Sequence, residues 1–389
     1  MRRRAVLAGC ACAGFLARSN AFGQAPSTWA MPPRFAPPEL ASDEGGLWAV
    51  MDREENRLKR SAFLLKDQAL SEYLAALVCR LAGTHCPDIR VYVMRTPWFN
   101  ASMAPNGMVQ IWSGLLLRLD NEAQLAAILA HELAHYISRH SLERLRDARS
   151  RAAFATLMLP FGLLGAIGQL AAMAGKFAFT REQERDADRI GIELMAGAGY
   201  DPRQAAEIWT QLLAEVKAGE DAGGDPARSS VLFATHPEPA EREADLRERA
   251  SAIAGTRELA LGADEYQRIV RPLRRSMLED ELRRRRSGES IHLLQRLITK
   301  SGDERGELRY FLAEVHRQRG SDNDVQRALE LYDAATQSGN PPPELFRGRA
   351  LLRWQQGDRV VAVADFQRYL ELSPQANDAD LIRSYLKGN

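Results

Sequence analysis

The stretch LAAILAHELAHYISRHS, residues 125–141, places three histidines and a glutamate on a segment with helical periodicity. His131 and His135 are four residues apart, so on a helix their side chains lie about 40° apart and one turn displaced. That spacing offers two imidazoles to one tetrahedral zinc ion. Glu132 lies about 100° from His131, beside the metal rather than bound to it, where it can take a proton from the attacking water. The stretch therefore predicts two metal ligands and a catalytic base.

His140 is the next histidine along the chain, but on a straight helix it lies about 180° from His131 and so faces away. In the metzincin motif HExxHxxGxxH, a glycine turn precedes the third histidine. No glycine lies between His135 and His140 in this chain. We therefore expect His140 to be a structural or surface residue, and the third ligand to come from elsewhere.

A candidate for the third ligand lies in FTREQERDADRIGIELMAGAGYDP, residues 179–202. Taken as a helix, this segment puts Glu184 and Asp188 inside its apolar face. The other residues of that face are Ala187, Gly191, Leu194 and Met195. Two carboxylates on a buried face are costly unless a metal or a charged partner compensates them. We predict that Glu184 is the third zinc ligand and that Asp188 accepts the free N–H of His131. The alternative is an amphipathic helix with a buried salt bridge to an arginine.

The pairing of HELAH, residues 131–135, with TREQERDAD, residues 180–188, resembles the HtpX/BepA-type gluzincin zinc metallopeptidases, peptidase family M48. It resembles in particular their exported bacterial members, which carry a C-terminal tetratricopeptide region. The resemblance covers roughly residues 45–250 and implies one zinc ion per subunit. It implies that the zinc ligands are His131, His135 and Glu184 and that the catalytic base is Glu132.

The same resemblance implies roles for two further segments. His236, in THP at residues 235–237, matches a histidine that approaches the metal. It is expected to be a fourth ligand that holds the enzyme latent, or a stabiliser of the transition state, with a simple helix-start histidine as the alternative. Asn100 and Ala101, in FNASMAPNG, resemble a strand that borders the cleft, where they would pair with the substrate backbone as an added strand.

Residues 1–25 have the pattern of a secretory signal peptide: arginines at 2–4, an apolar stretch, and small residues for cleavage. The export route stays open between the general secretory and twin-arginine pathways and a lipoprotein route through LAGC, residues 7–10. We expect a periplasmic protein, with membrane association as a further possibility. Residues 26–44 are expected to form a proline-rich leader.

Signal removal would leave two cysteines, Cys79 and Cys86. In an exported chain such a pair suggests one local disulfide between the end of a helix and the following strand. Two free, partly buried thiols are the alternative. The spacing excludes a CxxC metal site.

The predicted fold class is mainly α, of α+β type. A helical gluzincin-type metallopeptidase domain with a small antiparallel sheet is expected over residues 45–255, followed by a helical linker over 256–305. Tetratricopeptide-like helical hairpins are expected over 306–389. The first strand is predicted at 89–95, and two more flank the turn at 105–107.

The C-terminal region contains an internal repeat, because residues 343–376 follow the spacing of a tetratricopeptide unit. The residues that carry this spacing are Ala350, Gly357, Ala362, Phe366 and Pro374. The preceding stretch repeats it imperfectly with Ala313, Gly320, Ala328, Tyr332 and Ala335. Such arrays usually bind proteins or peptides, and the alternative is a plain helical hairpin.

Residues 152–175 carry no charge and are long enough to span a membrane. His135 and Glu184 lie on either side of this segment and must meet at one ion, so a single crossing would separate them. We expect a buried hairpin, a segment that dips into the membrane, or a plate over the cleft. HtpX itself is an integral membrane protein, and the lack of a convincing pair of spans departs from it.

The 389-residue chain has a net charge of +1, which gives no reason to expect a nucleic-acid partner. The predicted function is an exported zinc endopeptidase that acts on unfolded or misfolded proteins. The resemblance implies envelope quality control of outer-membrane proteins. The rival hypothesis is a chaperone-like binding protein in which the repeats bind other proteins and the metal site is latent or structural. A third is a membrane-embedded peptidase.

Overall fold

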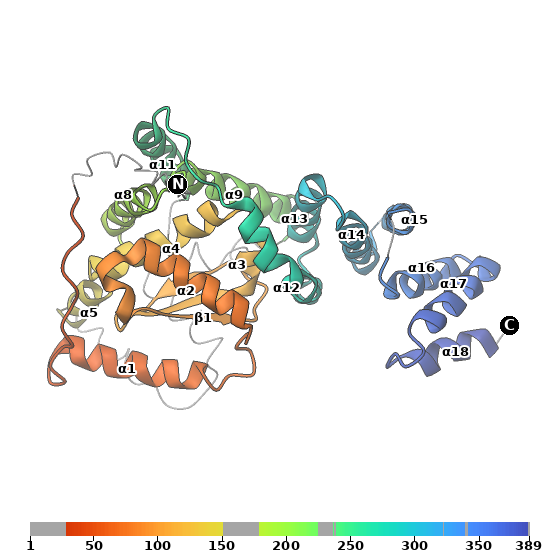
Figure 1. The fold of residues 1–389 in the computed structure, drawn as a ribbon. Coiled ribbons are helices and arrows are strands. Elements are labelled where there is room, and N and C mark those ends of the chain that lie inside the picture. The colour runs from red at the N-terminus through yellow and green to blue at the C-terminus, as the bar shows by residue number, and fades with distance from the viewer. Residues whose placement is uncertain are drawn as a thin grey trace, which may run out of the picture.

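The computed structural model describes residues 29–150, 179–224, 236, 239–321, 323–338 and 341–387. Figure 1 shows an N-terminal half in which helices surround a small sheet, and an arm of helical hairpins that leads to the C-terminus. The predicted mainly α class with a small β part is confirmed. The expected signal peptide and the apolar segment 152–175 lie outside the described residues. Among the helices that are described, none is both long and apolar enough to cross a membrane.

Helix α4, Glu122–Ile137, is the central helix of the N-terminal half. It begins where the sequence predicts, because the Asn121 side chain accepts a hydrogen bond of 2.8 Å from the Gln124 backbone N–H. Every residue of α4 except His131 is buried. This enclosure comes from helices α2 (Gln68–Ala82), α8 (Arg181–Gly197) and α9 (Gln204–Asp221) and from strand β2 (Ala101–Met103).

Helix α8 packs directly on α4 and begins with a capping box between Thr180 and Gln183. Gly191 lets the two helices approach closely, since a Cβ atom at this position would lie 3.1 Å from the backbone nitrogen of His131. Helix α11, Pro239–Ala254, packs against both α8 and α9. In Figure 1 these three helices lie on one side of α4, and the sheet and α1 lie on the other.

The sheet consists of β1 (Arg90–Met94), β2 (Ala101–Met103) and β3 (Met108–Trp112), in the order β1-β3-β2. Strands β2 and β3 form an antiparallel hairpin whose turn contains Gly107, at φ 85°. Strand β1 pairs with β3 in parallel, so the sheet is mixed and the predicted antiparallel arrangement is wrong for this pair. The reason is that β3, rather than β2, occupies the middle position. Strand β2 is thereby left at the edge that faces α4.

The N-terminal leader lies along the surface of this half. Residues 29–39 form no helix or strand, and α1 (Asp43–Leu58) follows. The Pro32 carbonyl oxygen lies 3.0 Å from Nε2 of the buried His85, and Arg34 pairs with Asp88. The structure joins Cys79, in α2, to Cys86, in the short helix η1 (Gly83–Asp88), with their Cα atoms 4.6 Å apart. The disulfide thus closes the loop that carries His85.

Helices α12 (Ala263–Arg284) and α13 (Ser287–Lys300) occupy the region expected to be a linker. They pack on α3 (Ser113–Arg118) and on α9, respectively. The buried Arg118 donates hydrogen bonds to Glu215 at 2.8 Å and to Glu281 at 2.9 Å, and Tyr266 donates one to the Leu116 carbonyl oxygen. Since buried ions are tolerated only when well paired, these bonds hold α12 in one place on the N-terminal half.

The repeats form two helical hairpins and a last helix. Their elements are α14 (Arg305–Arg319), α15 (Asp324–Thr336), α16 (Glu344–Gln355), α17 (Arg359–Leu372) and α18 (Ala379–Lys387). The small and aromatic repeat residues between the helices are buried: Ala313, Ala328, Tyr332, Ala335, Ala350, Ala362 and Phe366. Gly320 and Gly357 follow the first helix of each hairpin with φ of 65° and 87°, which suits glycine. The residues of the repeat pattern are therefore those at which the helices of the hairpins pack against one another.

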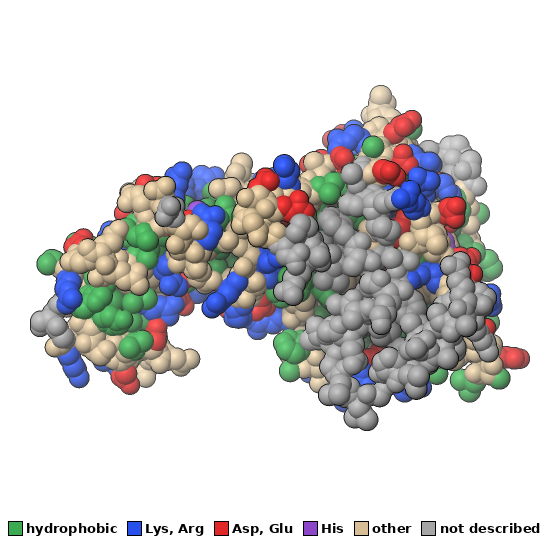
Figure 2. Space-filling model, turned by 180° about the vertical axis from the view of Figure 1, so that it is seen from behind, with side chains coloured by type: hydrophobic (Ala, Val, Ile, Leu, Met, Phe, Trp, Pro, Cys, Tyr) green, Lys and Arg blue, Asp and Glu red, His purple; other side chains and the backbone are tan. Residues whose placement is uncertain are grey.

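The free end of the arm exposes apolar side chains. Four large ones lie in its last two helices: Val360, Val361, Leu372 and Leu381. Figure 2, seen from behind, shows apolar side chains gathered at this end of the arm, between charged residues of both signs.

Candidate metal centre

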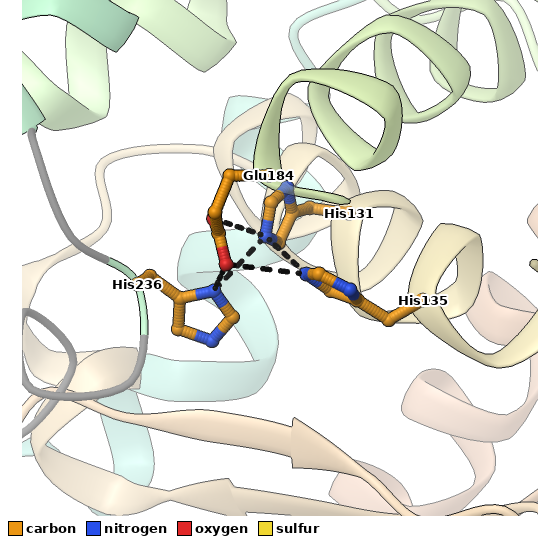
Figure 3. Close-up of side chains that lie close together, drawn as sticks. All are labelled: His131, His135, Glu184 and His236. Atoms are coloured by element: carbon orange, nitrogen blue, oxygen red, sulfur yellow. Dashed lines mark hydrogen bonds and ion pairs between the residues drawn. The ribbon is translucent and has the colours of Figure 1, made fainter. Parts of the chain in front are cut away.

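Four side chains meet between α4, α8 and His236, which lies three residues before the start of α11. His131 and His135 come from α4, Glu184 from α8, and His236 from the other side, as Figure 3 shows. One nitrogen or oxygen atom from each lies within 4.8 Å of the others. Nε2 of His131 is 3.1 Å from Nε2 of His135 and 3.2 Å from Nδ1 of His236. The structure thus brings together the three residues predicted as ligands and His236, the possible fourth ligand or transition-state stabiliser.

A close contact on the outer side of His131 indicates which of its nitrogens faces the centre as a lone pair. Nδ1 of His131 lies 2.9 Å from a carboxylate oxygen of Asp188, the acceptor predicted for it. A carboxylate can only accept, so the neutral form of His131 carries its proton on Nδ1 and presents Nε2 as a lone pair. Nε2 of His135 lies only 3.1 Å from Nε2 of His131 and faces it.

This donor set fits a metal ion. Imidazole nitrogens that converge this closely repel one another unless a proton or a cation lies between them. Three imidazoles and a carboxylate are the ligand types that a tetrahedral zinc ion takes. Glu184, which is 1% exposed, supplies the anionic ligand. The residues present therefore match the metal that the sequence predicts.

Electrostatics favour the metal-binding forms of His135 and Glu184. Burial lowers the pKa of His135 well below its usual value, so its imidazole is neutral. Burial alone would raise the pKa of Glu184, but electrostatic interaction with His236 and hydrogen bonding to His131 lower it overall. Burial also favours a lower pKa for His131, but hydrogen bonds to Asp188 and Glu184 raise it to about 9. A metal must displace any proton held there.

Glu132 lies beside the four candidate ligands and is not one of them. Its Oε2 accepts a hydrogen bond of 3.1 Å from the Met103 backbone N–H, and its Oε1 lies 3.4 Å from Nε2 of His236. The side chain is 5% exposed, and burial raises the pKa of its carboxyl group. A carboxylate with a raised pKa both accepts and returns a proton more readily near neutral pH.

His140 does not face away as the straight-helix argument predicts. Helix α4 ends at Ile137, and Arg139 has φ of 55°, so the chain turns before His140. The buried His140 places its Nδ1 2.9 Å from Nδ1 of His135. It is outside the group of four, as expected for a residue that is not a ligand, but it touches one of them. The predicted direction of His140 was wrong because helix α4 ends before this residue.

Arg242 is a residue of the site that sequence reasoning missed. It is 5% exposed on α11, with its guanidinium 2.6 Å from Glu184 and 2.7 Å from Asp188. The buried salt bridge considered as an alternative to metal binding is therefore present together with the converging ligands. Nothing local identifies Arg242, because it lies in a run of charged residues, EREADLRER, on a mostly exposed helix.

Asn100 and Ala101 lie at the sheet edge nearest to Glu132. Ala101 pairs with Ile111 in the β2–β3 hairpin, and the Asn100 carbonyl oxygen accepts a hydrogen bond from Trp112. The Asn100 side-chain oxygen is buried and has no hydrogen-bond partner among the described residues. The same strand supplies the Met103 N–H that binds Glu132. Edge strand β2 and the candidate base thus adjoin.

Comparison with known protein families identifies the domain that the N-terminal half forms. The family model of peptidase family M48 matches residues 64–250. These residues form a peptidase family M48 domain. The M48 domain is a metallopeptidase domain, as predicted, and implies a metal. A tetratricopeptide repeat model matches residues 320–387, which confirms that the chain contains such a repeat.

Relatives of the M48 domain include named proteases. The chain is 30% identical over 213 residues to the beta-barrel assembly-enhancing protease of Escherichia coli K12, covering 51% of this chain and 42% of that protein. The Yersinia pestis protein of that name is 32% identical over 221 residues, covering 53% and 44%. The mitochondrial metalloendopeptidase OMA1 of Schizosaccharomyces pombe is 34% identical over 162 residues, covering 41% and 45%. The chain spans less than half the length of these relatives.

Proposed function

We propose that this protein is a zinc-dependent endopeptidase that hydrolyses peptide bonds in unfolded or misfolded proteins. The observation that carries this proposal is the convergence of His131, His135 and Glu184 beside Glu132, inside an M48 domain. A bound zinc ion would polarise the scissile carbonyl and lower the pKa of the attacking water towards ~7.

The chain's own residues would perform the rest of the reaction. Glu132, beside the ligands and with a raised pKa, takes the proton from the attacking water and passes it to the leaving amine. Strand β2 holds the substrate as an added strand, with Asn100 and Ala101 next to the scissile bond. Asp188 holds His131 in its binding tautomer. Arg242 holds the carboxylates of Glu184 and Asp188 in place.

The position of His236 supports a latent resting state. A catalytic zinc site keeps one position open for water or substrate, whereas a site with four protein ligands is closed. Nδ1 of His236 lies 2.8 Å from Glu184, and its Nε2 lies on the Glu132 side. His236 thus takes the place that the attacking water would need, between the base and the other ligands.

Replacement of His236 by alanine is expected to raise cleavage of an unfolded protein by about tenfold or more. Without His236, the form with an open position for the attacking water is no longer a minor population. Zinc content should stay near one ion per chain, since three ligands remain. The measurement is digestion of a reduced, denatured protein together with metal analysis. A fall in cleavage with zinc retained would make His236 a transition-state stabiliser instead.

The biological setting is the part of the proposal that rests most on the relatives. The beta-barrel assembly-enhancing proteases, the signal-like first 25 residues and the repeats support a role in the bacterial envelope. We propose a periplasmic location, misfolded outer-membrane proteins as substrates, and protein partners at the repeats. The apolar segment 152–175 would provide peripheral membrane contact.

Removal of the metal tests the function directly. We expect the purified chain to contain one zinc ion, to lose cleavage of denatured protein on dialysis against a chelator, and to regain it with added zinc. Cleavage that survives complete zinc removal would refute the proposal. Zinc binding without cleavage, even in His236→Ala, would favour a chaperone-like binding protein.

A further inference from the structure

His140 is a buried histidine that the reaction described above does not use. It is 5% exposed, and its Nδ1 is 2.9 Å from Nδ1 of the ligand His135. The two rings lie edge to face with their centroids 5.0 Å apart. A contact of this length between two imidazole nitrogens is a hydrogen bond in which one of them carries the proton.

The location of that proton decides whether His135 can bind a metal. If His135 donates, its own Nε2 is a lone pair that faces the other ligands. If His140 donates instead, a neutral His135 carries its proton on Nε2 and cannot bind there. Nε2 of His140 lies 3.8 Å from a carboxylate oxygen of Asp186, which favours the proton on that side of His140. Nδ1 of His140 is then free to accept.

We propose that His140 is a positioning residue that accepts the Nδ1 proton of His135 and so holds His135 in its metal-binding tautomer. This inference rests on the metal site proposed above. The arrangement parallels the one at His131, where Asp188 is the acceptor. At His135 the acceptor is an imidazole with a carboxylate behind it.

The backbone supports this role, because the turn that delivers His140 is held in a conformation rare for its residue type. Arg139 has φ of 55°, which is costly for a side chain with a Cβ. Its guanidinium lies 4.2 Å from the centre of the Phe35 ring and pairs with Glu44 at 3.2 Å. The leader and α1 thus hold the turn that places His140 against His135.

The test compares zinc affinity in the full chain with and without an acceptor at position 140. His140→Leu keeps much of the volume but cannot accept, whereas the amide oxygen of His140→Asn can. We expect His140→Leu to bind zinc about 10–100-fold more weakly in competition with a chromophoric chelator, and His140→Asn to recover most of the loss. His140→Ala is the second variant without an acceptor, should His140→Leu not fold.

A matched control separates positioning from packing. His316 is also buried and paired through Nδ1, with Asp324 at 2.7 Å, but lies in the repeats. His316→Leu should lower the melting temperature without changing zinc affinity. For His140→Leu, the rise in melting temperature on adding zinc should shrink. Equal zinc affinities, within about threefold, for the native chain, His140→Leu and His140→Asn would overturn the inference. Failure of the native chain to bind zinc would instead refute the proposed metal site.

Discussion

Glu132→Gln is expected to lower the rate of peptide cleavage by about 10²–10⁴-fold, the range associated with loss of a general base. Glutamine has nearly the same shape, and its amide oxygen can still accept the hydrogen bond from the Met103 N–H. It cannot accept the proton of the attacking water. Because Glu132 is not among the four converging ligands, zinc content should not change. The loss should therefore appear in catalysis alone.

The measurement is best made in the His236→Ala background, where the proposed block has been removed and the starting rate is higher. Cleavage of a denatured protein is followed alongside zinc content for the single and double variants. Glu143→Gln is the matched control, since Glu143 is an exposed carboxylate on α5 (His140–Ser150) close to the site. Its rate should stay near that of the parent. A zinc-loaded Glu132→Gln protein that cleaves normally would place the base on another residue.

Arg242→Leu is expected to lower the free energy of unfolding of the zinc-free protein by about 3–5 kcal/mol, the cost of leaving a buried ion-pair partner uncompensated. Glu184 is 1% exposed and Asp188 is largely buried, and Arg242 contacts both carboxylates. Leucine fills part of the space but supplies no positive charge. Added zinc should restore part of the loss, because the ion compensates Glu184.

Urea unfolding in the presence of a chelator measures this effect, and Trp209 offers a local signal because the Arg242 guanidinium lies 4.6 Å from its ring centre. Arg247→Leu is the control on the same helix. The Arg247 side chain is 57% exposed and pairs with Glu243, so its loss should cost less than about 1 kcal/mol. Equal destabilisation by the two variants would contradict the proposed role of Arg242.

Local sequence patterns were sufficient to predict which residues share one face of a single helix. The four-residue spacing of His131 and His135 puts both imidazoles on one side of α4, and the same reasoning placed Glu184 and Asp188 on the buried face of α8. Helical periodicity is set by the backbone, so residues that share a face can be identified without knowing what the face meets. The two helical hairpins of the repeat were predictable for the same reason.

The features that sequence reasoning missed depend on how segments far apart in the chain pack together. The direction of His140 depends on the turn at Arg139. Phe35 and Glu44, which lie far away in the sequence, contact Arg139 and hold this turn. The parallel pairing of β1 with β3 depends on which strand takes the middle position. Neither is visible in a local pattern, because each is decided by contacts between residues far apart in sequence.

The sequence by itself determined which side chains can carry the proposed chemistry: two histidines and a glutamate on one helix, and two carboxylates on the apolar face of another. Their residue types and spacing leave few other uses for them. The tertiary structure alone decided what surrounds that chemistry. It brings Arg242 to Glu184 and Asp188, His236 to Glu184 and His140 to Nδ1 of His135. Burial makes these contacts matter, because a charge or lone pair removed from water must find its partner within the fold.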